Sequence, residues 1–103
     1  MAVIHVNETN YQEIAGSNKT VLLDFFAEWC GPCRMVSPLV DRLAEEHPEI
    51  VVAKVNVDEN RDLAMQYGVM SIPTLVVLKD GKPVKKNVGA IPYDAIVRLV
   101  AEG

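Results

Sequence analysis

Cysteine and histidine, the usual ligands of structural zinc, are scarce in this sequence. Its 103 residues include only two cysteines and two histidines. A structural zinc site takes four ligands, and neither His5 nor His47 stands in a finger-like spacing with the cysteines. We therefore expect no metal site.

Excess positive charge and long apolar runs are lacking as well. Ten basic residues face fourteen acidic ones, giving a formal net charge of −4, and nucleic-acid binding needs a basic stripe that is not visible here. No apolar run approaches the roughly 20 residues that cross a bilayer. The first residues lack the basic start and apolar core of a secretory signal. These absences disfavour nucleic acid and membrane as partners, and we expect a cytoplasmic protein.

The composition that remains is that of an ordinary globular protein. Half of the residues are hydrophobic and 23% are charged, which is typical of a folded chain. No repeat, low-complexity tract or linker divides the sequence. We therefore expect one domain over residues 1–103 with a single core, and we take it to be a monomer.

Apolar periodicity predicts the order strand, helix, strand, helix, strand, helix, strand, strand, helix. The strands are expected within residues 3–6, 21–27, 50–58, 75–78 and 84–88. A short helix is expected to start at a capping box in residues 9–12 and to end at Gly16, and longer patterns predict helices over residues 32–47, 60–67 and 92–101. Crossover helices followed by a hairpin at residues 79–82 produce an α/β fold with helices on both faces of a mixed sheet.

The two cysteines stand together in Trp29-Cys30-Gly31-Pro32-Cys33, between a strand-like run and a helix-like run. Two intervening residues let both sulfur atoms meet where the chain enters a helix, so a disulfide can form and open with little backbone movement. Cys30 would face the unpaired N–H groups and the positive end of the helix dipole, which favour a thiolate. Cys33, one turn further on, is expected to be less exposed and less acidic. The pattern predicts a redox-active pair.

Three alternatives compete with a redox role for the two cysteines. A structural disulfide would close a loop so short that it removes only about 2 kcal/mol of unfolded-chain entropy. A zinc site lacks its other ligands, and two unrelated buried cysteines would not need Gly31 and Pro32 between them. The redox interpretation fits the strand-to-helix context best.

Asp24 interrupts the apolar run of the second expected strand. A carboxylate inside a central strand loses its water, which raises its pKa unless a cation pairs with it. Such groups are frequently functional, although a structural aspartate with satisfied hydrogen bonds is the alternative. Lys54 alternates with apolar residues in the next strand. It could reach this carboxylate, or it could be an ordinary exposed lysine.

Four segments in this order resemble the thioredoxin family over essentially the full length of the chain. They are Asp24 to Cys33, Lys54 to Asp58, Ile72 to Thr74, and Val88 to Ala90. The resemblance implies the thioredoxin fold, a three-layer α/β/α arrangement around a central mixed sheet of about five strands and four helices. It also implies a general protein-disulfide reductase, an enzyme of thiol-disulfide exchange that donates electrons in cell redox homeostasis.

The resemblance also assigns roles within the site. Cys30 is the nucleophile that forms a mixed disulfide with a target, and Cys33 resolves it. Asp24 assists proton removal from Cys33, and Lys54 tunes the charge of Asp24. Pro73 matches the family's cis-proline beside the dithiol, an isomer that the residues alone do not settle.

A target-binding rim follows from the same resemblance. Its residues are Trp29, Gly31, Pro32, Ile72, Pro73, Thr74, Gly89 and Ala90. Phe26 and the pair Met70-Ser71 depart from what many relatives carry. These departures affect the choice of partner and leave the sulfur chemistry intact.

No cofactor is expected to be bound. The implied partners are disulfide-containing target proteins and an FAD-containing thioredoxin reductase that passes on electrons from NADPH. The alternatives are a protein-disulfide oxidase or isomerase of the same fold, and a binding subunit whose dithiol is incidental. Gly31 and Pro32 between the cysteines resemble the reductases.

Overall fold

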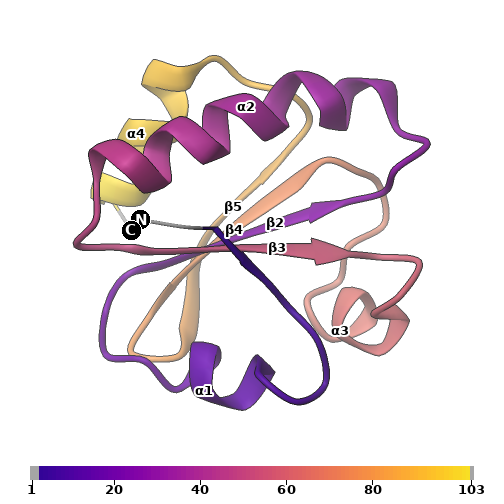
Figure 1. The fold of residues 1–103 in the computed structure, drawn as a ribbon, viewed down its shortest axis with the longest axis horizontal. Helices are drawn as coiled ribbons and strands as arrows, with labels where there is room; N and C mark the ends of the chain where they lie inside the picture. Colours follow the sequence, from indigo (N-terminus) through magenta and orange to yellow (C-terminus); the bar gives the residue numbers. More distant parts are fainter. Residues whose placement is uncertain (1–2, 103) are drawn as a thin grey trace.

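Five strands form the middle layer of the computed structural model, which describes residues 3–102 (Figure 1). The strands are β1 (Ile4–His5), β2 (Val21–Phe26), β3 (Val51–Asn56), β4 (Thr74–Lys79) and β5 (Lys82–Val88). The helices are α1 (Tyr11–Ala15), α2 (Gly31–Glu46), α3 (Arg61–Gln66) and α4 (Tyr93–Glu102). Helices α2 and α4 cover one face of the sheet, and α1 and α3 cover the other (Figure 1). The expected element order and three-layer α/β/α fold are confirmed.

The strand order across the sheet is β1-β3-β2-β4-β5. β1, β3 and β2 run parallel, because the connections between them cross over the sheet through helices. β4 pairs antiparallel with β2, and β5 pairs antiparallel with β4. β2 therefore lies at the centre, where its first five residues are buried, which explains its nearly continuous apolar run.

Side chains alternate between the two faces of the sheet. Leu23 and Phe25 of β2 belong to the core under α1 and α3. Leu22 belongs to the core under α2 and α4. Asp24 shares the face of Leu22, and Lys54 lies in register with Asp24 on the neighbouring strand β3. Both charged side chains are thereby placed under α2.

The expected hairpin joins β4 to β5 through Asp80 and Gly81. Both turn residues have positive φ, 53° and 76°, as a two-residue turn between twisted strands requires. β5 is an edge strand, and Pro83 and the lysines of this strand are exposed. The sequence prediction of a hairpin with a charged, proline-containing edge is confirmed.

The start of α1 differs from the expected capping box. Asn10, rather than Thr9, is the N-cap, and its side chain makes no capping hydrogen bond. Instead, Oδ1 of Asn7 accepts from the backbone N–H groups of Thr9 and Asn10, at 2.8 and 2.9 Å. This local turn occupies the groups that a capping box would use. The helix consequently begins at Tyr11, and Gly16 ends it as expected.

The longest helix, α2, has 16 residues. Across residues 3–102, no helix is both long enough and apolar enough to cross a membrane.

Candidate active site

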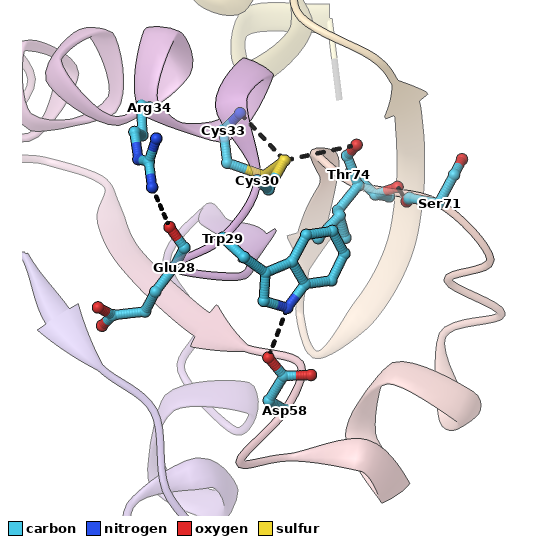
Figure 2. The surroundings of a disulfide bond; sticks show 9 residues. Glu28, Trp29, Cys30, Cys33, Arg34, Asp58, Ser71 and Thr74 are labelled. Atoms are coloured by element: carbon cyan, nitrogen blue, oxygen red, sulfur yellow. Dashed lines mark hydrogen bonds between the residues drawn. A yellow bond between two sulfur atoms is a disulfide. The ribbon is translucent and has the colours of Figure 1, made fainter.

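The two cysteines form a disulfide at the junction between β2 and α2 (Figure 2). Cys30 is the N-cap of α2, with extended backbone, and its Cα lies 5.3 Å from the Cα of Cys33. The backbone N–H of Cys33 donates to Sγ of Cys30 over 3.2 Å. The strand thus delivers Cys30 to the point where the helix begins, as the sequence pattern predicts.

This position supports a negative charge on Cys30. The first turn of α2 holds no acidic residue, so the positive end of the helix dipole is not cancelled there. Pro32 occupies the first turn, where a missing N–H removes no helical hydrogen bond. Once the disulfide opens, the N–H of Cys33 and the helix dipole both stabilise a thiolate at Cys30.

One prediction about the pair is wrong for the disulfide form. The sequence pattern predicts that Cys33 is less exposed than Cys30, but each cysteine is 4% exposed. Phe26, Val57 and Ile72 pack against the cluster that contains both cysteines, so the whole pair is covered. The two residues still differ in their helix positions, because only Cys30 occupies the cap.

The loop before β4 lies beside the dithiol. Its Ile72–Pro73 peptide bond is cis, as the family resemblance implies. The carbonyl oxygen of Ile72 lies 3.9 Å from Sγ of Cys30. The hydroxyl of Thr74 donates to the carbonyl of Ser71 over 2.6 Å and closes this loop on itself (Figure 2). The backbone of this loop therefore borders Sγ of Cys30 at Ile72.

A hollow of about 510 Å³ opens between this loop and the start of α2. The residues that line it are Trp29, Cys30, Gly31, Pro32, Val57, Ala64, Val69, Met70, Ser71 and Ile72. We call this hollow the dithiol groove. Its lining is mostly apolar, and the side chains of Trp29 and Met70 are 67% and 96% exposed. Such a surface suits an extended, largely apolar segment of another molecule.

Not every expected rim residue reaches the dithiol groove. Thr74 is fully buried, so its side chain does not reach the surface. Gly89 lies beside Pro73, because its N–H donates to the carbonyl of Pro73 over 2.8 Å. Ala90 lines a separate hollow with Met35. Contrary to the expected rim, Pro73, Thr74, Gly89 and Ala90 lie outside the groove lining.

The groove also contains residues for which the sequence pattern indicates no binding role. Val57, Ala64 and Val69 line it, although their apolar character alone predicts core packing. No sequence signal separates an apolar residue at a groove floor from one inside the core. Met70 is different: the sequence marks it as a departure from the family pattern. Its exposed side chain forms part of the wall of the dithiol groove.

Asp24 is buried, with 2% exposure. The pKa of its carboxyl is raised from 3.8 to about 6, mainly by burial; the charge of Lys54 opposes this rise, and the charge of Asp41 adds to it. Its Oδ1 has no hydrogen-bond partner within the described residues. A buried carboxyl with such a pKa can accept or release a proton near neutral pH.

Lys54 lies close enough for its charge to lower the pKa of Asp24, as the resemblance implies, but its direct partners are on α2. Its Nζ donates to Oγ of Ser37 over 2.6 Å and lies 2.8 Å from Oδ1 of Asp41. Ser37 and Asp41 stand one turn apart on α2, so they present two oxygen atoms to the same ammonium. The side chain of Asp41 is 54% exposed, and its charge is solvated at lower cost than that of Asp24.

A disulfide across a helix N-cap, beside a cis-proline and an apolar groove, defines a thiol-disulfide exchange protein. The family model described as Thioredoxin matches residues 2–102. The thioredoxin of Alicyclobacillus acidocaldarius is 43% identical over 102 residues, covering 98% of this chain and 97% of that protein. Thioredoxin 1 of Synechococcus elongatus is 50% identical over 101 residues, covering 97% of this chain and 94% of that protein.

A solved structure is similar as well. A mutant thioredoxin from Halobacterium salinarum superimposes with a TM-score of 0.90 at 41% identity, covering 99% of this chain and 94% of that chain. The chain therefore belongs to the thioredoxin family. It is a thiol-disulfide oxidoreductase of the protein-disulfide reductase type, and the oxidase, isomerase and binding-subunit alternatives are not favoured.

Proposed function

We propose that the protein is a general reductant of protein disulfides, with Cys30 as the nucleophile and Cys33 as the resolving thiol. The observation that carries this assignment is the N-cap position of Cys30, whose sulfur accepts the N–H of Cys33 and borders the dithiol groove. A thiolate is favoured at that position. Cys33 lacks the cap position, so its thiol should ionise less readily than that of Cys30. This suits a thiol that reacts second.

The reaction balances as two exchanges. The Cys30 thiolate attacks one sulfur of a target disulfide, forms a mixed disulfide and releases the other target sulfur as a thiolate. Asp24 then takes the proton of Cys33, and the Cys33 thiolate attacks Sγ of Cys30 and releases the second target thiolate. The target gains two electrons and the protein becomes the Cys30–Cys33 disulfide.

Target recognition is assigned to the dithiol groove. An extended target segment would lie over the apolar lining, against Trp29 and Met70, with its backbone beside Ile72. Backbone pairing at Ile72 would hold the target regardless of its side chains. The apolar lining and the small size of Gly31 and Pro32 support a broad range of protein targets.

The remaining assignments concern how the protein is used in the cell. We take residues 1–103 to act as one domain and as a monomer in the cytoplasm, without nucleic acid. The oxidised pair would be reduced by an FAD-containing thioredoxin reductase that draws electrons from NADPH. This electron source follows from the family resemblance of the chain.

The first test is an NADPH-coupled turnover assay with reductase and a disulfide-containing protein target. Wild type should turn over, Cys30→Ser should not, and Cys33→Ser should accumulate a covalent adduct with the target that is visible by mass. Turnover by Cys30→Ser would overturn the assignment. Partner binding that survives Cys30→Ser without any wild-type turnover would favour a binding subunit instead.

The second test is the midpoint potential of the Cys30–Cys33 couple at neutral pH, followed by the fluorescence of Trp29, the single tryptophan. A potential below the cytosolic glutathione poise of about −220 to −260 mV is expected for a reductant. A potential well above that range would indicate a protein that donates disulfides.

A further inference from the structure

The ammonium of Lys54 is held by two residues of α2. Its bonds go to Oγ of Ser37 at 2.6 Å and Oδ1 of Asp41 at 2.8 Å. The Lys54 side chain is only 9% exposed, so this charge depends on those partners rather than on water. We call Ser37, Asp41 and Lys54 the lysine clamp.

The clamp lies along the same stripe of α2 as the resolving cysteine. Cys33, Ser37 and Asp41 follow one another at intervals of four residues, so they share one face of the helix. Ser37 also borders a hollow of about 200 Å³ that Cys33 lines. The lysine clamp is therefore built onto the helix that positions the second thiol.

Asp24 is the other group within reach of Lys54. The two residues lie in register on adjacent strands, on the same face of the sheet. The charged groups that face Asp24 are Lys54 from β3 and Asp41 from α2, and its antiparallel neighbour on β4, Leu75, carries no charge. Oδ1 of Asp24 has no partner within the described residues.

We propose that Ser37 and Asp41 are positioning residues for the reaction: they hold the Lys54 ammonium toward the exposed side of α2 and so leave Asp24 free to exchange a proton with Cys33. Asp41 competes with Asp24 for one buried cation. The ammonium binds Asp41 rather than Asp24 because the Asp41 carboxylate is half exposed and needs little desolvation. Ser37 adds a second oxygen acceptor at the same place.

The competition has a direct chemical consequence. Without Asp41, the flexible lysine stem can turn its ammonium toward the unpartnered carboxyl of Asp24. An ion pair there favours the carboxylate, lowers the pKa of Asp24 and makes it a weaker base toward the Cys33 thiol. This role of the clamp rests on the proposed proton transfer from Cys33 to Asp24, and the clamp adds the residues that make this transfer effective.

The experiment measures the pKa of Asp24 by carbon NMR of its carboxyl in the disulfide form, where neither cysteine titrates. Wild type should titrate near the pKa of about 6 set by burial. Asp41→Asn should lower this pKa, and Ser37→Ala should lower it less. Glu45→Gln is the matched control, because it removes one exposed carboxylate from the same helix without touching Lys54.

A second comparison separates positioning from simple charge repulsion. With Lys54→Met as the background, Asp41→Asn should move the pKa of Asp24 much less than it does in the presence of Lys54. An equal shift without Lys54 overturns the proposal, and so does an Asp24 pKa that is the same in Asp41→Asn and Glu45→Gln.

Kinetics distinguish failure of the clamp from failure of the proposed function. Asp41→Asn should slow resolution of the mixed disulfide several-fold at pH 7, with recovery at alkaline pH, and Glu45→Gln should not slow it. An unmoved Asp24 pKa in Asp41→Asn, with resolution still slow in Asp24→Asn, overturns the clamp alone. A lowered Asp24 pKa in Asp41→Asn, together with normal resolution in Asp41→Asn and in Asp24→Asn, overturns the proton-transfer role of Asp24. The clamp would then have no role in catalysis.

Discussion

The indole Nε1 of Trp29 donates a 2.8 Å hydrogen bond to Oδ2 of Asp58 (Figure 2). This bond joins the segment after β2, which carries the dithiol, to the turn after β3. Oδ1 of Asn56 accepts the backbone N–H of Asp58 over 2.9 Å and helps to fix that turn. An exposed indole that is anchored in this way stands as a fixed wall of the dithiol groove, so little ordering entropy is lost when a target binds.

Asp58→Ala should weaken target binding without changing the redox chemistry. Loss of the acceptor frees the indole, so the anisotropy of Trp29 fluorescence should fall and KM for a protein target should rise several-fold. The kcat and the midpoint potential should stay near wild type. Glu59→Ala is the control, because it removes a neighbouring exposed carboxylate without touching Trp29. A similar rise in KM in both variants would point to lost charge rather than a lost anchor.

Asp24→Asn should stabilise the folded protein at neutral and alkaline pH. The pKa of Asp24 is raised from 3.8 to about 6 in the folded state, so between these pH values the folded state binds more protons than the unfolded state. Stability therefore falls as the pH rises through this window. At about 1.36 kcal/mol per pKa unit, the cost of the buried carboxylate is about 3 kcal/mol above pH 6.

Urea unfolding at several pH values checks this prediction. Asn keeps the shape of Asp24 but carries no charge, so the variant should be more stable than wild type by about 3 kcal/mol at pH 8. The difference should vanish below about pH 4, where the aspartic acid is neutral in both states. A difference that does not change between pH 4 and pH 8 would mean that packing or hydrogen bonding, rather than ionisation, sets it.

The same substitution should slow the second exchange of the catalytic cycle. Without a carboxylate base, Cys33 must ionise unaided, so Asp24→Asn should slow resolution of the mixed disulfide by roughly tenfold or more at pH 7. Above about pH 9, the thiol ionises by itself and the defect should shrink. Stopped-flow release of a reduced target over this pH range measures the effect. Equal slowing at neutral and alkaline pH would contradict proton transfer by Asp24.

Sequence reasoning succeeded where local pattern determines structure. The apolar periods predicted every element in order, the residues Asp80 and Gly81 predicted the hairpin, and the spacing of Cys30 and Cys33 predicted a disulfide at a helix start. The apolar run around Asp24 predicted its burial. Each of these properties depends on a few neighbouring residues and on the period of one element.

The features that the sequence did not predict depend on how elements pack. The partner of Lys54 is set by the placement of α2 over β3, which brings Asp41 closer to the ammonium than Asp24. The groove lining likewise depends on how α3 and the loop after it lie against the start of α2. This packing leaves Val69 in the groove wall and places Ala90 in a separate hollow. Hydrophobicity alone does not distinguish these positions.

Gly81→Ala should destabilise the protein more than Gly68→Ala, although both glycines have positive φ, 76° and 66°. An added methyl at Gly81 would lie 2.9 Å from the carbonyl oxygen of Ala15, at the end of α1, whereas at Gly68 the nearest atom is the flexible side-chain end of Lys86, Nζ at 3.5 Å. Both variants bear the backbone cost of about 1–2 kcal/mol for a left-handed alanine, and only Gly81→Ala adds a clash with backbone. Thermal unfolding should therefore show a fall in Tm of roughly 4–16 °C for Gly68→Ala and a larger fall for Gly81→Ala. Equal falls would mean that the hairpin turn can move away from α1 at no cost.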